Sequence, residues 1–153
     1  MNPFALLKED HTKFKAMLSD LEATTDRAEK TRTQIFAELK HQLVAHEAVE
    51  EEVFYPAIRA KAKAKDEKLV LEAYAEHHVA DVVVEELTEL PVTDEMWAAK
   101  AKVLQENLEH HIEEEEGDLF ATARALLDKG ELEELGTRMD ARKAELLGDV
   151  ATV

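Results

Sequence analysis

The sequence predicts an all-α protein, an antiparallel up-down-up-down four-helix bundle with a short C-terminal helix. Charged residues make up 35% of the 153 residues, and there are only four glycines and three prolines, a composition typical of long helices. Apolar residues also recur at spacings of three and four, which is the period of a helix face and not of a strand. Short connections between such helices favour antiparallel neighbours.

The first two helices are expected over residues 3–24 and 29–63. Pro3 suits a helix start, because the amide hydrogen that it lacks would be unpaired there in any residue. Pro56 lies inside the second helix. It should kink or break that helix near its end, because proline removes a backbone hydrogen bond and clashes with the carbonyl four residues earlier.

The third and fourth helices are expected over residues 67–90 and 93–129. The third helix should stop before Pro91, because the residue preceding a proline avoids the helical conformation. Thr93 is the expected N-cap of the fourth helix, since its hydroxyl can accept a hydrogen bond from the first turn. Gly130 is expected to end that helix.

A fifth, shorter helix is expected over about residues 131–147, packed on the outside of the bundle, and the residues after Gly148 are expected to fray. No linker-like segment divides the chain. We therefore expect residues 1–153 to form a single domain, with the bundle over about residues 3–129.

The charge and the missing residue types exclude several classes of function. The formal net charge of −16 would repel phosphate backbones, which argues against nucleic-acid binding. The absence of cysteine excludes disulfides, thiolate metal sites and cysteine catalysis. The N-terminus does not resemble a secretory signal, and no apolar run approaches the roughly 20 residues of a membrane span. We expect a cytoplasmic protein without membrane contact, and a monomer is favoured.

Six polar side chains interrupt the apolar stripes, at positions that face the core of a bundle. They are His11, His46, Glu50, His77, His111 and Glu115. A buried carboxylate without a partner is costly, and a buried imidazole needs partners for its ring nitrogens. Six such residues at matching heights require a common explanation.

The six residues also form an internal repeat. His11 precedes His46 by 35 residues, and His77 precedes His111 by 34. A glutamate follows both His46 and His111 four residues later, which places it one turn away on the same helix face. Each half of the chain therefore supplies one histidine from its first helix and a His-x-x-x-Glu pair from its second.

Imidazole and carboxylate ligands without a thiolate suit iron, manganese or zinc. If both glutamates bridge two metals, each metal receives two histidine nitrogens and two glutamate oxygens. An octahedral ion then keeps two positions, one for a shared bridge and one for dioxygen, peroxide or water. We expect two iron ions with an oxo or hydroxo bridge. Manganese would fit the same ligands, and zinc would fit without a redox function.

The same residues resemble the hemerythrin-like, or HHE cation-binding, domain family over roughly residues 4–127. The matching segments are Lys8-Glu-Asp-His11, His46-Glu-x-x-Glu50-Glu-x-x-Phe-Tyr-Pro56, Glu76-His77 and His111-x-x-x-Glu115-Glu-x-x-Leu-Phe120. The resemblance implies a single hemerythrin-like four-helix domain with a non-haem di-iron site. It also implies that the two glutamates bridge the metals and that the iron ligands are His11, His46, Glu50, His77, His111 and Glu115.

One position departs from the oxygen-carrying hemerythrins, which have a His-x-x-x-His pair on the third helix. This chain has Asp81 four residues after His77. Asp81 could bind a metal, hold a water or support a ligand, and Glu47, directly after His46, is a further possible ligand. A carboxylate in place of a neutral imidazole would lower the iron potential. The resemblance therefore favours iron sensing, or peroxide or nitric oxide handling, over reversible oxygen carriage.

Three functions are compatible with this pattern. The first is a redox-active di-iron protein that binds or reacts with dioxygen, peroxide or nitric oxide, in a catalase-like or oxidase-like reaction. The second is a non-enzymatic iron-binding or iron-sensing module. The third is a structural bundle in which the glutamates satisfy the histidines. A ferritin-like ferroxidase fits less well, because that class uses Glu-x-x-His pairs.

Other residues near the pattern have simpler interpretations. His78 and His110 each lie one residue, about 100° around the helix, from a ligand candidate, so we expect them to flank the site. His41 is expected in solvent, and Tyr55 and Trp97 are expected to pack in the core.

Most of the other acidic residues beside the two glutamates are expected to form a solvated face, namely Glu51, Glu52, Glu113, Glu114 and Glu116. Gly117 in the fourth helix costs about 1 kcal/mol relative to alanine. It could allow a kink or a close approach of helices below the site.

Overall fold

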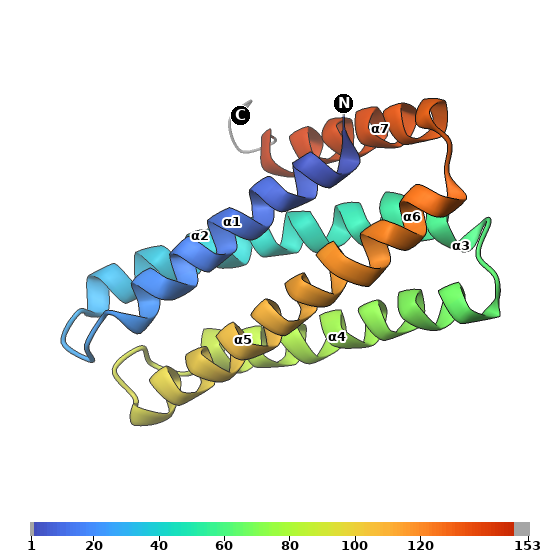
Figure 1. Cartoon of the computed structure of the whole chain (residues 1–153). Coiled ribbons are helices and arrows are strands. Elements are labelled where there is room, and N and C mark those ends of the chain that lie inside the picture. The colour runs from blue at the N-terminus through green and yellow to red at the C-terminus, as the bar shows by residue number, and fades with distance from the viewer. Residues whose placement is uncertain (1, 149–153) are drawn as a thin grey trace.

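The computed structural model describes residues 2–148, and the regular structure in that range is helical. The bundle consists of α1 (Pro3–Glu22), α2 (Glu29–Val49), η1 (Glu50–Phe54), α3 (Tyr55–Arg59), α4 (Ala64–Glu89), α5 (Glu95–Glu114), η2 (Glu115–Leu119) and α6 (Phe120–Leu126). Because α2, η1 and α3 follow one path, and α5, η2 and α6 another, the chain makes four antiparallel passes (Figure 1). The predicted fold class is confirmed.

The helix α7 (Lys129–Gly148) packs on the outside of the bundle against α1 and α2 (Figure 1). It begins earlier than predicted, because Asp128 and Glu131 form a reciprocal cap. The Asp128 side chain accepts a hydrogen bond from the amide of Glu131 at 2.8 Å, and the Glu131 side chain accepts one from the amide of Asp128 at 3.0 Å. Gly130 therefore lies inside α7, and the prediction that it ends the fourth helix is wrong. The residues after Gly148 lie outside the described range.

The start of α1 agrees with the prediction, whereas the start of α5 does not. The Asn2 side chain accepts a hydrogen bond from the amide of Phe4 at 2.8 Å, and Pro3 is the first helical residue. At α5 the N-cap is Asp94 and not Thr93, since the Asp94 carboxylate accepts from the amide of Met96 at 2.8 Å. A carboxylate at this position also interacts favourably with the helix dipole.

The second and fourth helical passes each contain one π-helical turn, η1 and η2. In η1 the amide of Tyr55 donates to the carbonyl of Glu50, five residues earlier. Pro56 follows immediately and has no amide hydrogen to donate. The hydrogen-bond pattern of the helix therefore changes at the position where proline could not continue the regular pattern. The helix therefore passes through Pro56 without a break and ends at Arg59, before the predicted residue 63.

Each π-helical turn inserts one residue and rotates the following turns by about 100°. The sequence pattern continued the buried face of the fourth helix from Glu115 through Asp118, which is exposed in the structure. Leu119 and Ala123 are buried instead. Gly117 lies in η2, and a Cβ atom there would meet no described atom of another helix within 4 Å. Close approach of helices therefore does not explain this glycine.

The apolar core forms two clusters with a layer of polar side chains between them. One cluster includes Phe4 and Phe120, whose ring centroids lie 4.9 Å apart. The other includes Phe14 and Trp97, and the indole nitrogen of Trp97 donates to the carbonyl of Leu87 at 3.1 Å. Each large side chain buried in this way contributes about 1.5–3 kcal/mol. Together the two clusters hold the intervening layer of polar residues in a fixed position.

The buried Arg32 joins two loops at the end of the bundle distant from α7. Its guanidinium donates to the Thr24 hydroxyl at 2.9 Å and to the Val92 carbonyl at 2.7 Å, and it lies 5.4 Å from the Trp97 ring centroid. A planar cation with several donors can satisfy such loop carbonyls at once.

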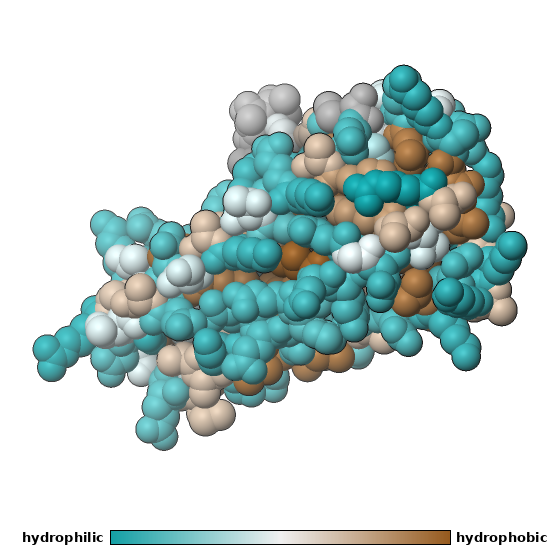
Figure 2. All heavy atoms as spheres, viewed as in Figure 1, coloured by the Kyte–Doolittle hydropathy of each residue, from teal (hydrophilic) through white to brown (hydrophobic). Residues whose placement is uncertain are grey.

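The visible face of the molecule is covered mostly by hydrophilic side chains, with smaller hydrophobic areas between them (Figure 2). Among the described residues, every helix is too short or too polar to cross a membrane.

Candidate metal centre

The polar layer between the two apolar clusters contains all six residues that interrupt the stripes. Each is buried, with at most 6% of its surface exposed. One histidine comes from each of α1, α2, α4 and α5, and the two glutamates begin the π-helical turns η1 and η2. The six are His11, His46, Glu50, His77, His111 and Glu115.

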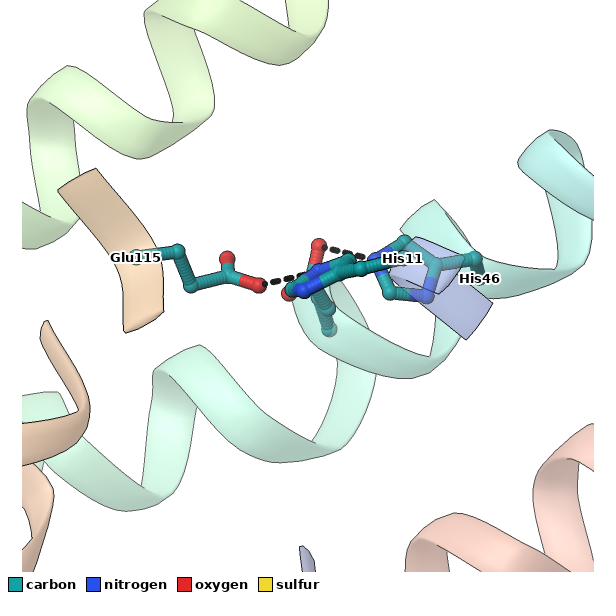
Figure 3. Close-up of side chains that lie close together, drawn as sticks. His11, His46 and Glu115 are labelled. Atoms are coloured by element: carbon teal, nitrogen blue, oxygen red, sulfur yellow. Dashed lines mark ion pairs between the residues drawn. The ribbon is translucent and has the colours of Figure 1, made fainter. Parts of the chain in front are cut away.

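The histidines meet the glutamates through their Nε2 atoms. On one side of the layer, His11 Nε2 lies 3.0 Å from Glu115 Oε1, and His46 Nε2 lies 3.2 Å from Glu50 Oε1. Figure 3 shows the Glu115 carboxylate directed at the His11 ring, with His46 beside it. One ligand atom from each of these four residues lies within 4.8 Å of the others. Such a spacing fits a single cation between them.

The other side of the layer repeats this arrangement. His77 Nε2 lies 3.0 Å from Glu50 Oε1, and His111 Nε2 lies 3.3 Å from Glu115 Oε2. Ligand atoms of Glu50, His77 and His111 form a second group within 4.8 Å of one another. Glu50 belongs to both groups, so its carboxylate lies between two potential cation positions.

Each histidine also contacts a carboxylate through its outer nitrogen, Nδ1. His46 Nδ1 lies 2.9 Å from Asp10, and His111 Nδ1 lies 2.8 Å from Glu76. An ionised carboxylate can only accept a hydrogen bond, so Nδ1 carries the hydrogen. In a neutral imidazole the lone pair is then on Nε2, directed at the glutamates. Carboxylate partners of this kind orient metal-binding histidines and raise their basicity.

The two remaining histidines have equivalent partners. His11 Nδ1 lies 2.7 Å from Glu116, and His77 Nδ1 lies 2.9 Å from Glu51. Glu51 and Glu116 are partly exposed, in line with the predicted solvated face, but each also supports a buried histidine, which was not predicted. A pattern in the sequence could have identified these partners. An acidic residue precedes each first-helix histidine, and another follows each buried glutamate.

The electrostatics of the polar layer favour a positive charge. Burial lowers the pKa of His46, but Glu50 and Asp10 outweigh burial and raise it to about 10. Burial also lowers the pKa of His111, and here the Glu115 and Glu76 carboxylates raise it to about 11. Glutamates that hold protons so tightly on imidazoles would also attract metal cations to the same place.

Tyr55 breaks the two-fold pattern of this layer. Its hydroxyl donates to Glu115 Oε2 at 2.7 Å and lies 3.2 Å from His77 Nε2. Phe120 occupies the equivalent place in the other half and lies over the His11 ring, with centroids 6.4 Å apart. Burial, together with Glu115 and Glu50, holds the pKa of Tyr55 well above its usual range. Tyr55 therefore places a protonated phenol inside the site, beyond its predicted packing role.

Several buried atoms of the layer lack hydrogen-bond partners within residues 2–148. They are His11 Nε2 and Glu115 Oε1, which lie 3.0 Å apart but form no hydrogen bond, and Glu50 Oε2, together with Glu47 Oε2 at the edge of the layer. Leaving polar atoms unsatisfied in an apolar interior is costly. The unsatisfied atoms of His11, Glu50 and Glu115 belong to residues of the two groups of ligand atoms, so the residues present fit a bound metal pair.

The sequence profile of the hemerythrin HHE cation binding domain matches residues 2–123 of this chain. The chain belongs to this family. A crystal structure of a hemerythrin HHE cation binding domain-containing protein, the Rv2633c homolog from Mycobacterium kansasii, superimposes on this HHE domain with a TM-score of 0.85. The two chains are 28% identical, and the match covers 99% of this chain and 91% of the other.

Two further relatives differ in how much of their length corresponds to this HHE domain. The protein Rv2633c of Mycobacterium tuberculosis is 31% identical over 156 residues, which cover 97% of this chain and 89% of Rv2633c. A DNA nickase from Nostoc sp. is 26% identical over 155 residues, which cover 99% of this chain. The matched residues make up only 43% of the nickase, so this chain spans less than half of that protein.

Glu47 and Asp81, the two possible additional ligands, lie at the edge of the polar layer. Glu47 is 6% exposed and its Oε2 atom lies 3.6 Å from His77 Nδ1, the nitrogen that faces away from Glu50. Burial raises the pKa of Glu47 to about 9, and the neighbouring Asp81 adds to this effect. Asp81 is exposed. The structure therefore places both residues on the outer side of His77.

The remaining histidines lie outside the polar layer. His41 is exposed, as expected, and so is His78. His110 is exposed too, and its Nε2 atom lies 3.1 Å from Glu114. The three therefore lie on the surface and do not contribute to the buried cluster.

Proposed function

We propose that this HHE domain holds two iron ions and reacts with dioxygen, peroxide or nitric oxide. The observation that supports it is the pair of buried ligand groups that share Glu50. One ion would be held by His11 and His46, the other by His77 and His111. Both glutamates would bridge the two ions, since each approaches histidines on both sides of the layer.

The ligand types favour iron over other cations. Two imidazoles and two carboxylates for each ion form a mixed nitrogen and oxygen set, which suits iron or manganese and lacks the thiolates of many structural zinc sites. Four protein ligands leave two positions of an octahedral ion for small molecules. Bound iron would supply the electrons for reaction with dioxygen or peroxide, or a binding position for nitric oxide.

A small pocket between α4 and α5 gives access to this site. Its lining includes His111, Glu115 and Glu76, and its volume is about 70 Å³. A water molecule occupies about 30 Å³ in the liquid, so the pocket fits a diatomic molecule or peroxide but no large substrate. The equivalent face in the other half is covered by α7, where Lys143 lies 2.6 Å from Asp10. Access is therefore expected on the His111 side.

Tyr55 is the residue best placed to assist a reaction on that side. Its hydroxyl is close to both His77 and Glu115 and stays protonated. It can donate a hydrogen bond, or a proton, to a small ligand held beside these residues. The equivalent Phe120 has no such group, so the two metal positions would differ in reactivity.

The test is anaerobic addition of ferrous iron to the metal-free protein, followed by air or peroxide. We expect two iron ions per chain, and absorption bands in the near ultraviolet and visible that develop after the oxidant is added. His77→Ala should reduce the iron content, while His78→Ala, one residue away and exposed, should leave it unchanged. Absence of bands and of peroxide consumption in iron-loaded protein would rule out the redox function.

The alternative is a non-enzymatic iron-binding or iron-sensing module, and the position of α7 favours it. Lys143 of α7 contacts Asp10, which in turn contacts His46. Iron bound to His46 would change the charge on this connection and so the docking of α7. Hydrogen exchange would test it. Faster exchange in α7 after iron removal supports sensing, and equal exchange in both states excludes it.

We propose small molecules and not nucleic acid as the partners of this domain. The net charge of −16 would oppose binding to a phosphate backbone. We therefore do not extend to this chain the activity for which the Nostoc nickase is named. A gel-shift assay at low salt would reveal nucleic-acid binding if this proposal were wrong.

A further inference from the structure

A second acidic feature lies outside the metal centre, in a groove between α2 and α4. The groove has a volume of about 620 Å³. One lysine, Lys40, faces it, and this side chain also donates to the Thr88 hydroxyl at 3.1 Å. Six carboxylates line it, namely Glu47, Glu51, Glu52, Asp81, Glu85 and Glu89. A groove lined by one sign of charge raises the local concentration of counter-ions.

Glu47 distinguishes this groove from an ordinary acidic surface. Its side chain is 8% exposed, and its Oε2 atom is buried with no hydrogen-bond partner among the described residues. His77 Nδ1, 3.6 Å away, is not free to satisfy this oxygen, because it already contacts Glu51 at 2.9 Å. A cation is one of the groups that can satisfy a nearly buried carboxylate oxygen that has no hydrogen-bond partner.

Asp81 and Glu51 complete a set of oxygen ligands around Glu47. Asp81, exposed on α4, lines the same groove as Glu47, and its charge contributes to the raised pKa of Glu47. Glu51 is partly exposed, and ligand atoms of Glu51, Glu47 and His77 lie within 4.8 Å of one another. Carboxylates open to water suit a hard divalent cation that keeps several water ligands.

This set of carboxylates is separate from the metal centre but adjacent to it. An imidazole directs its two nitrogens to different sides of the ring. His77 Nε2 faces Glu50, whereas its Nδ1 faces Glu47 and Glu51. A cation held by Glu47 and Glu51 would therefore lie on the outer side of His77. Glu50 and Glu51 nevertheless each lie about one helical turn from Glu47, three and four residues further along the chain.

We propose that Glu47, Glu51 and Asp81 form an outer divalent-cation site that receives ferrous iron from the groove and transfers it to the centre. The transfer rests on the proposed function, whereas cation binding in the groove does not. The outer site binds more weakly than the centre, because it has no imidazole ligand and is partly open to water. Glu50 belongs to the centre and directly precedes Glu51 in the chain. It would therefore be the first carboxylate of the centre to receive a cation from the outer site.

Binding is tested on protein whose centre has first been loaded with iron. Mn²⁺ is then added, and its binding is measured by electron paramagnetic resonance. We expect one additional Mn²⁺ per chain in the wild type and none in Asp81→Asn. Asp81 is exposed, so this variant is expected to fold normally. Glu89→Gln, which removes the same charge from the same groove, should retain the Mn²⁺ site. Equal binding in Asp81→Asn and Glu89→Gln would overturn the outer site.

Transfer is tested by stopped-flow mixing of metal-free protein with ferrous iron. We expect Asp81→Asn and Glu47→Gln to load about tenfold more slowly, with the same final content of two iron ions and the same absorption bands. Glu89→Gln should load at nearly the wild-type rate. Equal rates in all four proteins would overturn the transfer step.

The two proposals fail in different ways. If the wild type never holds two iron ions, the proposed function fails. In that case the metal-free wild type could still bind Mn²⁺. If Asp81→Asn abolished this binding, the outer site would still be supported. If the wild type loads normally and Asp81→Asn has no effect on binding or rate, only the outer site is overturned.

Discussion

The carboxylate of Asp10 offers a sharp test of how the structure supports the metal centre. Asp10 is 3% exposed and joins two cations or potential cations, His46 at 2.9 Å and Lys143 at 2.6 Å. Asp10→Asn keeps the size of the side chain but removes its charge. Asparagine has a single carbonyl oxygen, so it can accept strongly from only one of the two partners.

The expected magnitude follows from these two contacts. A hydrogen bond to a charged group contributes about 1.5–3 kcal/mol, and a neutral one about 0.5–1.5 kcal/mol. Losing one charge-assisted bond and weakening the other should therefore reduce the stability of the metal-free protein by about 2–4 kcal/mol. Removing the partner of a metal-binding histidine typically weakens metal affinity by about 10–100-fold.

Urea denaturation of the metal-free protein measures the first effect, and competition with a chelator for ferrous iron measures the second. Glu9→Gln is the matched control, because Glu9 is the adjacent acidic residue on α1, is exposed, and forms an exposed ion pair with Lys13 at 3.6 Å. The same stability and the same iron affinity in both variants would refute the role assigned to Asp10.

Three further predictions concern other parts of the molecule. Tyr55→Phe should keep two iron ions per chain but slow the reaction with peroxide by about 10²-fold; an unchanged stopped-flow rate would reduce Tyr55 to a packing residue. Arg32→Ala should cost about 3 kcal/mol in urea denaturation, because it leaves the Val92 carbonyl without this donor, while metal analysis should find the iron content unchanged. Removing bound iron with a chelator should lower the melting temperature by about 5–10 °C, because metal stabilises only the folded state; equal melting curves would contradict a bound pair.

The sequence was sufficient to predict the fold class and the six residues of the polar layer. Both predictions depended on periodicity. A histidine such as His77 stands out from an apolar stripe because Ala73, Tyr74 and Ala80, three and four positions away, are apolar, and the repeat doubled that signal. The structure brings all six together. Their role as metal ligands stays a prediction until metal is measured.

The partners of the histidines were not predicted, because their regular positions beside the ligand candidates do not by themselves show which acidic side chain points inward. Glu50 and Glu51 are adjacent, yet one is buried between histidines and the other supports His77 from the edge of the groove. Which glutamate in such a run points inward depends on the local helix geometry. Here a π-helical turn begins at Glu50, and no periodicity of 3.6 residues predicts it.

The same turns explain why Tyr55 was underestimated. In a regular helix the residue five positions after Glu50 would lie on a different face. The π-helical turn returns Tyr55 to the face of Glu50, so its hydroxyl reaches Glu115. In the fourth helix the equivalent turn buries Leu119 and leaves Asp118 exposed. These two errors therefore have one physical origin, a change in helical phase at each glutamate.

Metal analysis of freshly purified protein, combined with anaerobic reconstitution, tests the central claim most directly. The account predicts two iron ions per chain in the wild type. It also predicts a clear loss in Glu50→Ala, because Glu50 belongs to both groups of ligand atoms. A wild type that takes up no iron, or that takes up the same amount as Glu50→Ala, would contradict it.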